Sequence, residues 1–280
     1  MNNFRARTIT GLSMVFLMLA ALFFSPVAFA LIFLAVAVLG LLEFYTVMAS
    51  AECHPQKITG TILGTLWYLL VTICNFQLGP VGAVFLFTAF LPFLFLPFIS
   101  ELYRKKEKPL QNVAMTILGL VYIALPLSLL NIMYTRENGA LLHHFPAYLT
   151  SYFLITWIYD TGAYLVGITI GKHKFFERIS PKKTWEGTLG GVIFAALAAV
   201  GLYYISQDIR LTDLLVLTFI IVLFGTFGDL SESLFKRSLN LKDSGNLLPG
   251  HGGILDRFDT IFVSAPFVFL YFIFEITFQY

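Results

Sequence analysis

Apolar residues in this chain form long continuous runs, separated by short polar segments. Polarity does not alternate within a run, which favours helices and disfavours the strands of a barrel. A helix needs roughly 20 apolar residues to cross a bilayer. Lipid offers no hydrogen-bond partners to backbone N–H and C=O groups, so a spanning segment must be a helix or part of a closed barrel. The pattern therefore predicts an all-α, polytopic integral membrane protein, a helical bundle of about nine transmembrane helices.

The predicted spans follow directly from the apolar runs. They cover Thr8–Phe24, Val27–Met48, Ile58–Phe76, Pro80–Ile99, Val113–Tyr134, Tyr148–Gly171, Gly187–Ser206, Leu211–Leu230 and Thr260–Tyr280. Because apolar runs extend to the last residue, we expect one membrane domain over 1–280, with a helical scaffold in 1–134 and the catalytic helices and loops in 148–280. The first runs resemble a cleavable signal peptide, but Leu31–Leu42 continues the hydrophobicity, so we expect an uncleaved first span.

Hydrophobic residues make up 58% of the chain and charged ones only 12%, which excludes an ordinary soluble domain.

The basic residues give the expected orientation. If the N-terminus is cytoplasmic, all 18 Lys and Arg residues except Arg136 and Arg210 fall on the cytoplasmic side, as the positive-inside rule requires. Such a face suits anionic headgroups and nucleotide phosphates. The alternative is that these charges, including the Arg104–Lys108 cluster, only orient insertion.

Charged residues also gather between the last two predicted spans, in residues 231–259. If the eighth span continues as a helix, spacings of three, four and seven place polar side chains on one face. They are Asp229, Glu232, Ser233 and Lys236. Asp256 and Asp259 begin the ninth span, and acids from adjacent helix ends can bind one Mg²⁺ through their oxygens. Solvated surface acids are the alternative, but flanking glycines, which allow close backbone approach, favour a site.

Two further segments suit phosphate. Gly250–Gly253 directly precedes a predicted helix, whose N-terminal amides favour anions; its His251 could donate to a phosphate or a leaving group, or simply fill a turn. In Ser180–Gly187, hydroxyls and lysines suit a polyphosphate, and Pro181 predicts a helix beginning with free N–H groups. A plain positive-inside anchor is the alternative for this second segment.

Asp160 lies near the middle of the sixth predicted span. An ionisable group at that depth is costly unless it faces a polar interior, so it marks a candidate functional site. A structural hydrogen bond to a neighbouring helix is the other interpretation.

The segment from Ser233 to Asp259 resembles the signature of the CDP-diacylglycerol synthase, or phosphatidate cytidylyltransferase, family. Its fixed polar positions are met by Ser233, Lys236, Arg237, Lys242, Asp243, His251, Gly252, Gly253, Asp256, Arg257 and Asp259. Segments 159–164 and 180–187 also resemble family motifs. The first half of the chain resembles the family only in its apolar spans.

The resemblance implies transfer of the cytidylyl group of CTP to phosphatidic acid, with pyrophosphate released, in phospholipid biosynthesis. It implies Mg²⁺ at Asp229 and Asp256 and permits K⁺ as a second cation. We expect Asp243 and Asp259 either to be additional ligands or to support the residues that bind the metal. Phosphate charge would be neutralised by Lys236, Arg237, Lys242 and Arg257. Substrate would be bound by Ser180, Lys182, Lys183, Thr184, Ser233, His251, Gly252 and Gly253. Asp160 would lie deeper and orient a cation or a polar network.

We therefore expect a protein of the bacterial plasma membrane that contacts membrane lipids, with its active site facing the cytoplasm and no nucleic acid as a partner. A homodimer is permitted but not required. Three alternatives stay open: an enzyme for an isoprenyl-ether phosphatidate, a CTP-dependent polyprenol kinase that would release CDP, and a transporter coupled through Asp160.

Overall fold

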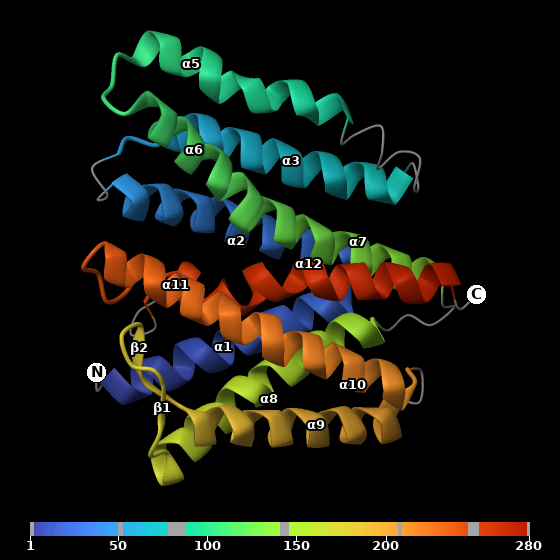
Figure 1. Cartoon of the computed structure of the whole chain (residues 1–280). Coiled ribbons are helices and arrows are strands. Elements are labelled where there is room, and N and C mark those ends of the chain that lie inside the picture. The colour runs from blue at the N-terminus through green and yellow to red at the C-terminus, as the bar shows by residue number, and fades with distance from the viewer. Residues whose placement is uncertain are drawn as a thin grey trace. The chain divides into compact units, whose positions relative to one another are not determined.

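The computed structural model describes residues 3–49, 53–77, 88–140, 146–206, 209–245 and 252–278. Within them the chain is almost entirely helical (Figure 1). Its contacts divide it into two compact units. Unit 1 comprises Met1–Arg136 and Leu239–Phe258, and unit 2 comprises Glu137–Ser238 and Asp259–Tyr280. The all-α, polytopic membrane fold that the hydropathy pattern predicts is confirmed.

Unit 1 combines the first half of the chain with Leu239–Phe258. Its elements are α1 (Asn3–Phe24), α2 (Pro26–Met48), α3 (Lys57–Gln77), the 3-10 turn η2 (Leu91–Phe95), α5 (Leu96–Arg104), α6 (Pro109–Gly119), the π turn η3 (Leu120–Ala124) and the start of α7 (Leu125–Ala140). Helices α2 and α3 lie side by side and α6 packs against both (Figure 1). The Tyr45 ring of α2 fills the space beside Gly60 and Gly119, and its hydroxyl donates to the Thr116 carbonyl at 2.7 Å.

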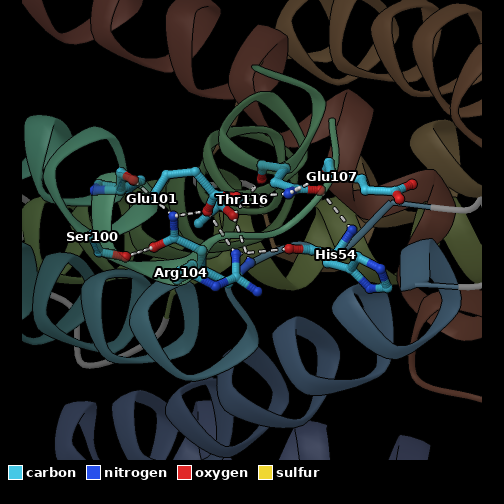
Figure 2. Close-up of polar contacts among 9 residues, drawn as sticks. His54, Ser100, Glu101, Arg104, Glu107 and Thr116 are labelled. Atoms are coloured by element: carbon cyan, nitrogen blue, oxygen red, sulfur yellow. Dashed lines mark hydrogen bonds and ion pairs between the residues drawn. The ribbon is translucent and has the colours of Figure 1, made fainter. Parts of the chain in front are cut away.

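A buried carboxylate ties α5 and α6 to the segment that precedes α3 (Figure 2). Glu101 accepts hydrogen bonds, each of 2.7 Å, from Gln56 Nε2, Asn112 Nδ2 and Arg104 Nη1. Arg104 also donates to the His54 carbonyl at 2.8 Å, so it is part of a polar network. Burial alone would raise the pKa of Glu101, but these donors outweigh it and lower the pKa.

Unit 2 contains the second half of the chain. Its elements are α8 (Ala147–Ile170), β1 (Lys174–Phe176), β2 (Ser180–Thr184), α9 (Trp185–Ser206), α10 (Leu211–Ile220), the π turn η4 (Ile221–Gly225), α11 (Thr226–Ser238) and α12 (Leu255–Phe278), which begins in unit 1. Helices α8 and α9 pack closely (Figure 1). A Cβ on Gly191 would lie 2.8 Å from the Tyr159 ring. Likewise, Gly228 of α11 packs against α12 backbone at Asp259.

Among the residues that the structure describes, seven helices are long and apolar enough to cross a membrane. They are Pro26–Met48, Lys57–Cys74, Pro109–Tyr134, Ala147–Ile170, Trp185–Ser206, Leu211–Ser238 and Leu255–Glu275. The remaining two predicted spans do not reach this standard among the described residues. In α1 only Val15–Phe24 is a short apolar helix. Of the predicted fourth span, residues 80–87 lie outside the described part, and most of the rest forms η2 and α5, whose second residues are Pro92 and Pro97.

We predict that Glu101→Gln lowers the free energy of unfolding by about 1–3 kcal/mol, because a buried amide cannot accept from all three donors. Thermal unfolding in detergent should show a lower Tm, whereas Glu107→Gln, at an exposed position, should leave the Tm unchanged. A depressed pKa stabilises the fold above the ordinary glutamate value of 4.5 and loses that effect as the pH falls below it. The Tm of Glu101→Gln should therefore approach that of the wild type as the pH is lowered. A difference in Tm that stays constant with pH would contradict the charge-based explanation.

Candidate functional site

In unit 1, the residues before α12 hold Asp256 in a fixed position. Asp256 Oδ2 accepts hydrogen bonds from Ser244 N at 3.0 Å, Ser244 Oγ at 2.9 Å and Gly253 N at 2.8 Å. The turn that allows this contains Gly252, whose φ of +81° disfavours any residue with a Cβ. Asp256 thus lies in the first turn of α12, fixed by neighbours on the preceding loop.

Glu43 of α2 is a member of this arrangement that the sequence analysis missed. Its carboxylate accepts hydrogen bonds from Ile254 N at 2.8 Å and Leu255 N at 3.1 Å, and it is also hydrogen-bonded to Ser244 Oγ. A signal for it exists in the sequence, since Glu43 is an isolated acid within an apolar span. The rule that selected Asp160 applies equally to it.

In unit 2, the polar face predicted for the continuing eighth span is confirmed. Asp229 lies in the first turn of α11 and forms an ion pair with Lys183 of β2. One turn later, Ser233 Oγ donates to Asp229 Oδ1 at 3.3 Å. Glu232 and Lys236 form a second pair at 2.6 Å, again four residues apart. Two lysines are therefore held beside two carboxylates on one short stretch of helix and strand.

Asp160 and Asp259 add two further carboxyl groups to this face of unit 2. Asp259 is half-buried, and Asp160, Asp229 and Glu232 lie close enough to repel its charge. Asp160 itself is exposed on α8. The structure thus brings Asp160 near the acids of α11 and α12, and its role in orienting a cation or a polar network stays a prediction.

The other predicted site residues divide between the two units. Gly252, Gly253, Lys242, Asp243 and Arg257 belong to unit 1, and the last three are exposed. In unit 2, Lys182 is exposed and Ser180 is half-buried. Arg237, also exposed, donates from Nε to the Ile179 carbonyl at 3.4 Å. His251 lies outside the described residues, as does Gly250.

The prediction that Pro181 starts a helix is wrong. Ser180–Thr184 forms strand β2, paired antiparallel with β1 so that Phe176 faces Ser180 and Lys174 faces Thr184. Proline is tolerated here because a two-stranded sheet consists of edge strands, where its missing N–H need not be paired. Helix α9 begins only at Trp185, and the buried Thr184 caps it by accepting from Gly187 N at 3.2 Å.

The donor groups suit a hard cation by their chemistry. Carboxylate and hydroxyl oxygens are ligands that suit Mg²⁺. Unit 2 presents them at Asp229 and Ser233, and unit 1 presents them at Asp256 and Ser244. Within the part of the chain that the structure describes, no group of three or more His, Cys, Asp or Glu is arranged to hold a metal ion. Mg²⁺ at Asp229 and Asp256 therefore stays a prediction, as do ligands at Asp243 and Asp259.

Comparisons with known proteins agree over most of the chain. The model of the Cytidylyltransferase family matches residues 5–274. A phosphatidate cytidylyltransferase of Staphylococcus aureus is 36% identical over 199 residues, which cover 71% of this chain and 74% of the relative. The proteins of that name from Staphylococcus saprophyticus and Staphylococcus haemolyticus are 40% and 47% identical, over 163 and 133 residues. Those alignments cover 58% and 47% of this chain, and 60% and 49% of the relatives.

We predict that Gly253→Ala lowers the free energy of unfolding by about 1–3 kcal/mol, measured by thermal unfolding in detergent. The added Cβ would collide with the Glu43 carboxylate, and displacing that group breaks its bonds to Ile254 and Leu255. Gly201→Ala is the matched control, because no atom lies within 4 Å of its Cβ position. It should be neutral or stabilise the helix by about 0.5–1 kcal/mol. Equal effects at both positions would contradict the close approach at Gly253.

Proposed function

Because this chain belongs to the cytidylyltransferase family, we propose that it transfers the cytidylyl group of CTP to phosphatidic acid. The products are CDP-diacylglycerol and pyrophosphate, in phospholipid biosynthesis. The observation that carries this proposal is the family match over residues 5–274, together with relatives that share the name phosphatidate cytidylyltransferase. The fixed position of Asp256 within the signature segment supports it.

The reaction makes modest demands on proton transfer. A phosphate oxygen of the lipid forms a bond to the α-phosphorus of CTP, and the bond from that phosphorus to the bridging oxygen breaks, so that pyrophosphate leaves. The attacking oxygen is already anionic, so a strong general base is unnecessary. Catalysis then rests on positioning and on neutralising the phosphate charge.

The chain's own residues would supply both the positioning of the substrates and the neutralisation of phosphate charge. Lys183 and Lys236, already oriented by Asp229 and Glu232, would bind phosphate oxygens. The exposed cations Lys182, Arg237, Lys242 and Arg257 would do the same. We assign further substrate contacts to Ser180, Ser233, His251, Gly252 and Gly253. Thr184, which caps α9, would support the β1–β2 hairpin that carries Ser180, Lys182 and Lys183.

The metal assignment extends this proposal. Asp229 and Asp256 would hold Mg²⁺, with Asp243 and Asp259 as additional ligands and K⁺ as a second cation. When bound, Mg²⁺ supplies positive charge that offsets the charge developing on the phosphates. The hydrogen bonds that fix Asp256 and the neighbours of Asp229 support these roles, because oriented carboxylates are the ligands that Mg²⁺ takes.

The finer membrane topology is also proposed. We place nine spans, with the N-terminus and the active site on the cytoplasmic side of a bacterial plasma membrane and with lipid around the apolar helices. The segregation of basic residues and the bacterial relatives support this arrangement. A homodimer is compatible with it.

We expect purified protein in micelles to transfer label from the α-phosphate of CTP to phosphatidic acid, with matching pyrophosphate release. EDTA should abolish transfer, and Asp229→Asn and Asp256→Asn should each reduce it roughly 100-fold or more, because charge neutralisation is lost. Asp213→Asn is the matched control. It lies on the same continuous helix as Asp229, about 24 Å away at 1.5 Å per residue, and pairs with Arg210.

Labelled lipid in wild type and in Asp213→Asn, but not in the site variants, would support both the function and the site. Transfer of label from the γ-phosphate with release of CDP would instead indicate a lipid kinase. Normal turnover of Asp256→Asn would contradict the metal assignment alone.

Topology can be tested with single cysteines, after Cys53 and Cys74 are replaced by alanine. A membrane-impermeant maleimide applied to intact cells should label Arg136→Cys and spare Lys174→Cys, because the basic loops are retained inside. Permeabilised cells should show labelling of both. Labelling of Lys174→Cys in intact cells would contradict the proposed orientation.

A further inference from the structure

A carboxylate from α2 caps the helix that carries Asp256. Ile254 and Leu255, whose amides donate to Glu43, stand at the beginning of α12. The first amides of a helix have no partner within the helix and bind anions well. Glu43 satisfies two of them from a distant part of the chain, and so fixes where α12 begins.

Ser244 connects Glu43 to Asp256. Its side chain is buried, and its Oγ lies within hydrogen-bonding distance of Glu43 and of Asp256 Oδ2. A hydroxyl carries one proton and can donate to one carboxylate at a time. The Ser244 amide donates to Asp256 as well, at 3.0 Å. A displacement of Ser244 would therefore remove two donors from Asp256.

The loop packs on Glu43 through residues without side chains. A Cβ on Gly245 would lie 3.0 Å from Glu43 Cδ, and one on Gly253 would collide with the same carboxylate. The backbone thus approaches Glu43 at both ends of the segment. These two close approaches limit how far the Glu43 carboxylate can move relative to Gly245 and Gly253.

We propose that Glu43 is a positioning residue for Asp256, acting through Ser244 and through the first amides of α12. Glu43 needs no contact with CTP or lipid in this role. It holds the segment that begins at Ser244, so that the Asp256 carboxylate is already oriented before substrate arrives. This role rests on the proposed function, in which Asp256 serves cytidylyl transfer.

The test compares Glu43→Gln with Glu101→Gln in the full chain. Both remove the charge of a glutamate in unit 1 that accepts three hydrogen bonds, but the bonds of Glu101 go to Gln56, Asn112 and Arg104. Hydrogen–deuterium exchange in detergent, without substrate or metal, measures protection of the 244–258 peptide. We expect exchange there to rise about tenfold or more in Glu43→Gln, and to match wild type in Glu101→Gln.

Turnover per folded molecule is the second readout. Glu43→Gln should lower kcat by roughly 10- to 100-fold, because misplacement of a catalytic group slows the reaction by such factors. Glu101→Gln should stay within about twofold of wild type. The double variant Glu43→Gln/Ser244→Ala should have a kcat only slightly below that of the more impaired single variant. The effects of residues in one network are not additive.

Each contrary result is informative. Wild-type exchange of the 244–258 peptide in Glu43→Gln would overturn the proposal, and so would raised exchange with undiminished kcat. Fully multiplicative losses in the double variant would overturn the route through Ser244. If wild-type protein transfers no label to lipid, the proposed function fails, while the exchange comparison still reports whether Glu43 holds the loop.

Discussion

The structure depends on how it accommodates carboxylates within an apolar bundle. An ionised carboxylate away from water costs several kcal/mol unless donors or cations surround it. Glu101 meets this requirement with donors from three segments, Glu43 with the start of α12, and Asp213 and Glu275 with Arg210. In each case the acid links the segments that supply its donors. Polar residues thus define positions that apolar packing alone would leave less specific.

Local spacing explains what the sequence could predict. Long apolar runs require helices, so the seven spans found among the described residues could be recognised, within the nine predicted, without any knowledge of contacts. The face formed by Asp229, Ser233 and Lys236 follows from helical geometry once the helix continues past the span. The weaker predictions concern runs with prolines. Pro92 and Pro97 lie in the first turns of η2 and α5, and the apolar run around them does not form one long helix among the described residues.

Contacts between distant residues explain what the sequence could not predict. Glu43 and Ile254 are 211 positions apart, and no local pattern indicates that they meet. Pro181 is compatible with a helix start or an edge strand, and its pairing with the β1 segment decided between them. Asp256 could be selected from the sequence because a signature surrounds it. The residues that hold it in place could be identified only from the fold.

The charge balance of unit 2 argues for a cation with the substrate. Lys183 and Lys236 pair with Asp229 and Glu232, while Asp160 and Asp259 add further carboxyl groups to the same face. A nucleotide triphosphate brought to these acids would be repelled at close range, where a low dielectric strengthens the interaction. We therefore expect positive charge to accompany the triphosphate. Acids that repel the bare nucleotide and bind a hard cation would favour the nucleotide with its metal over either alone.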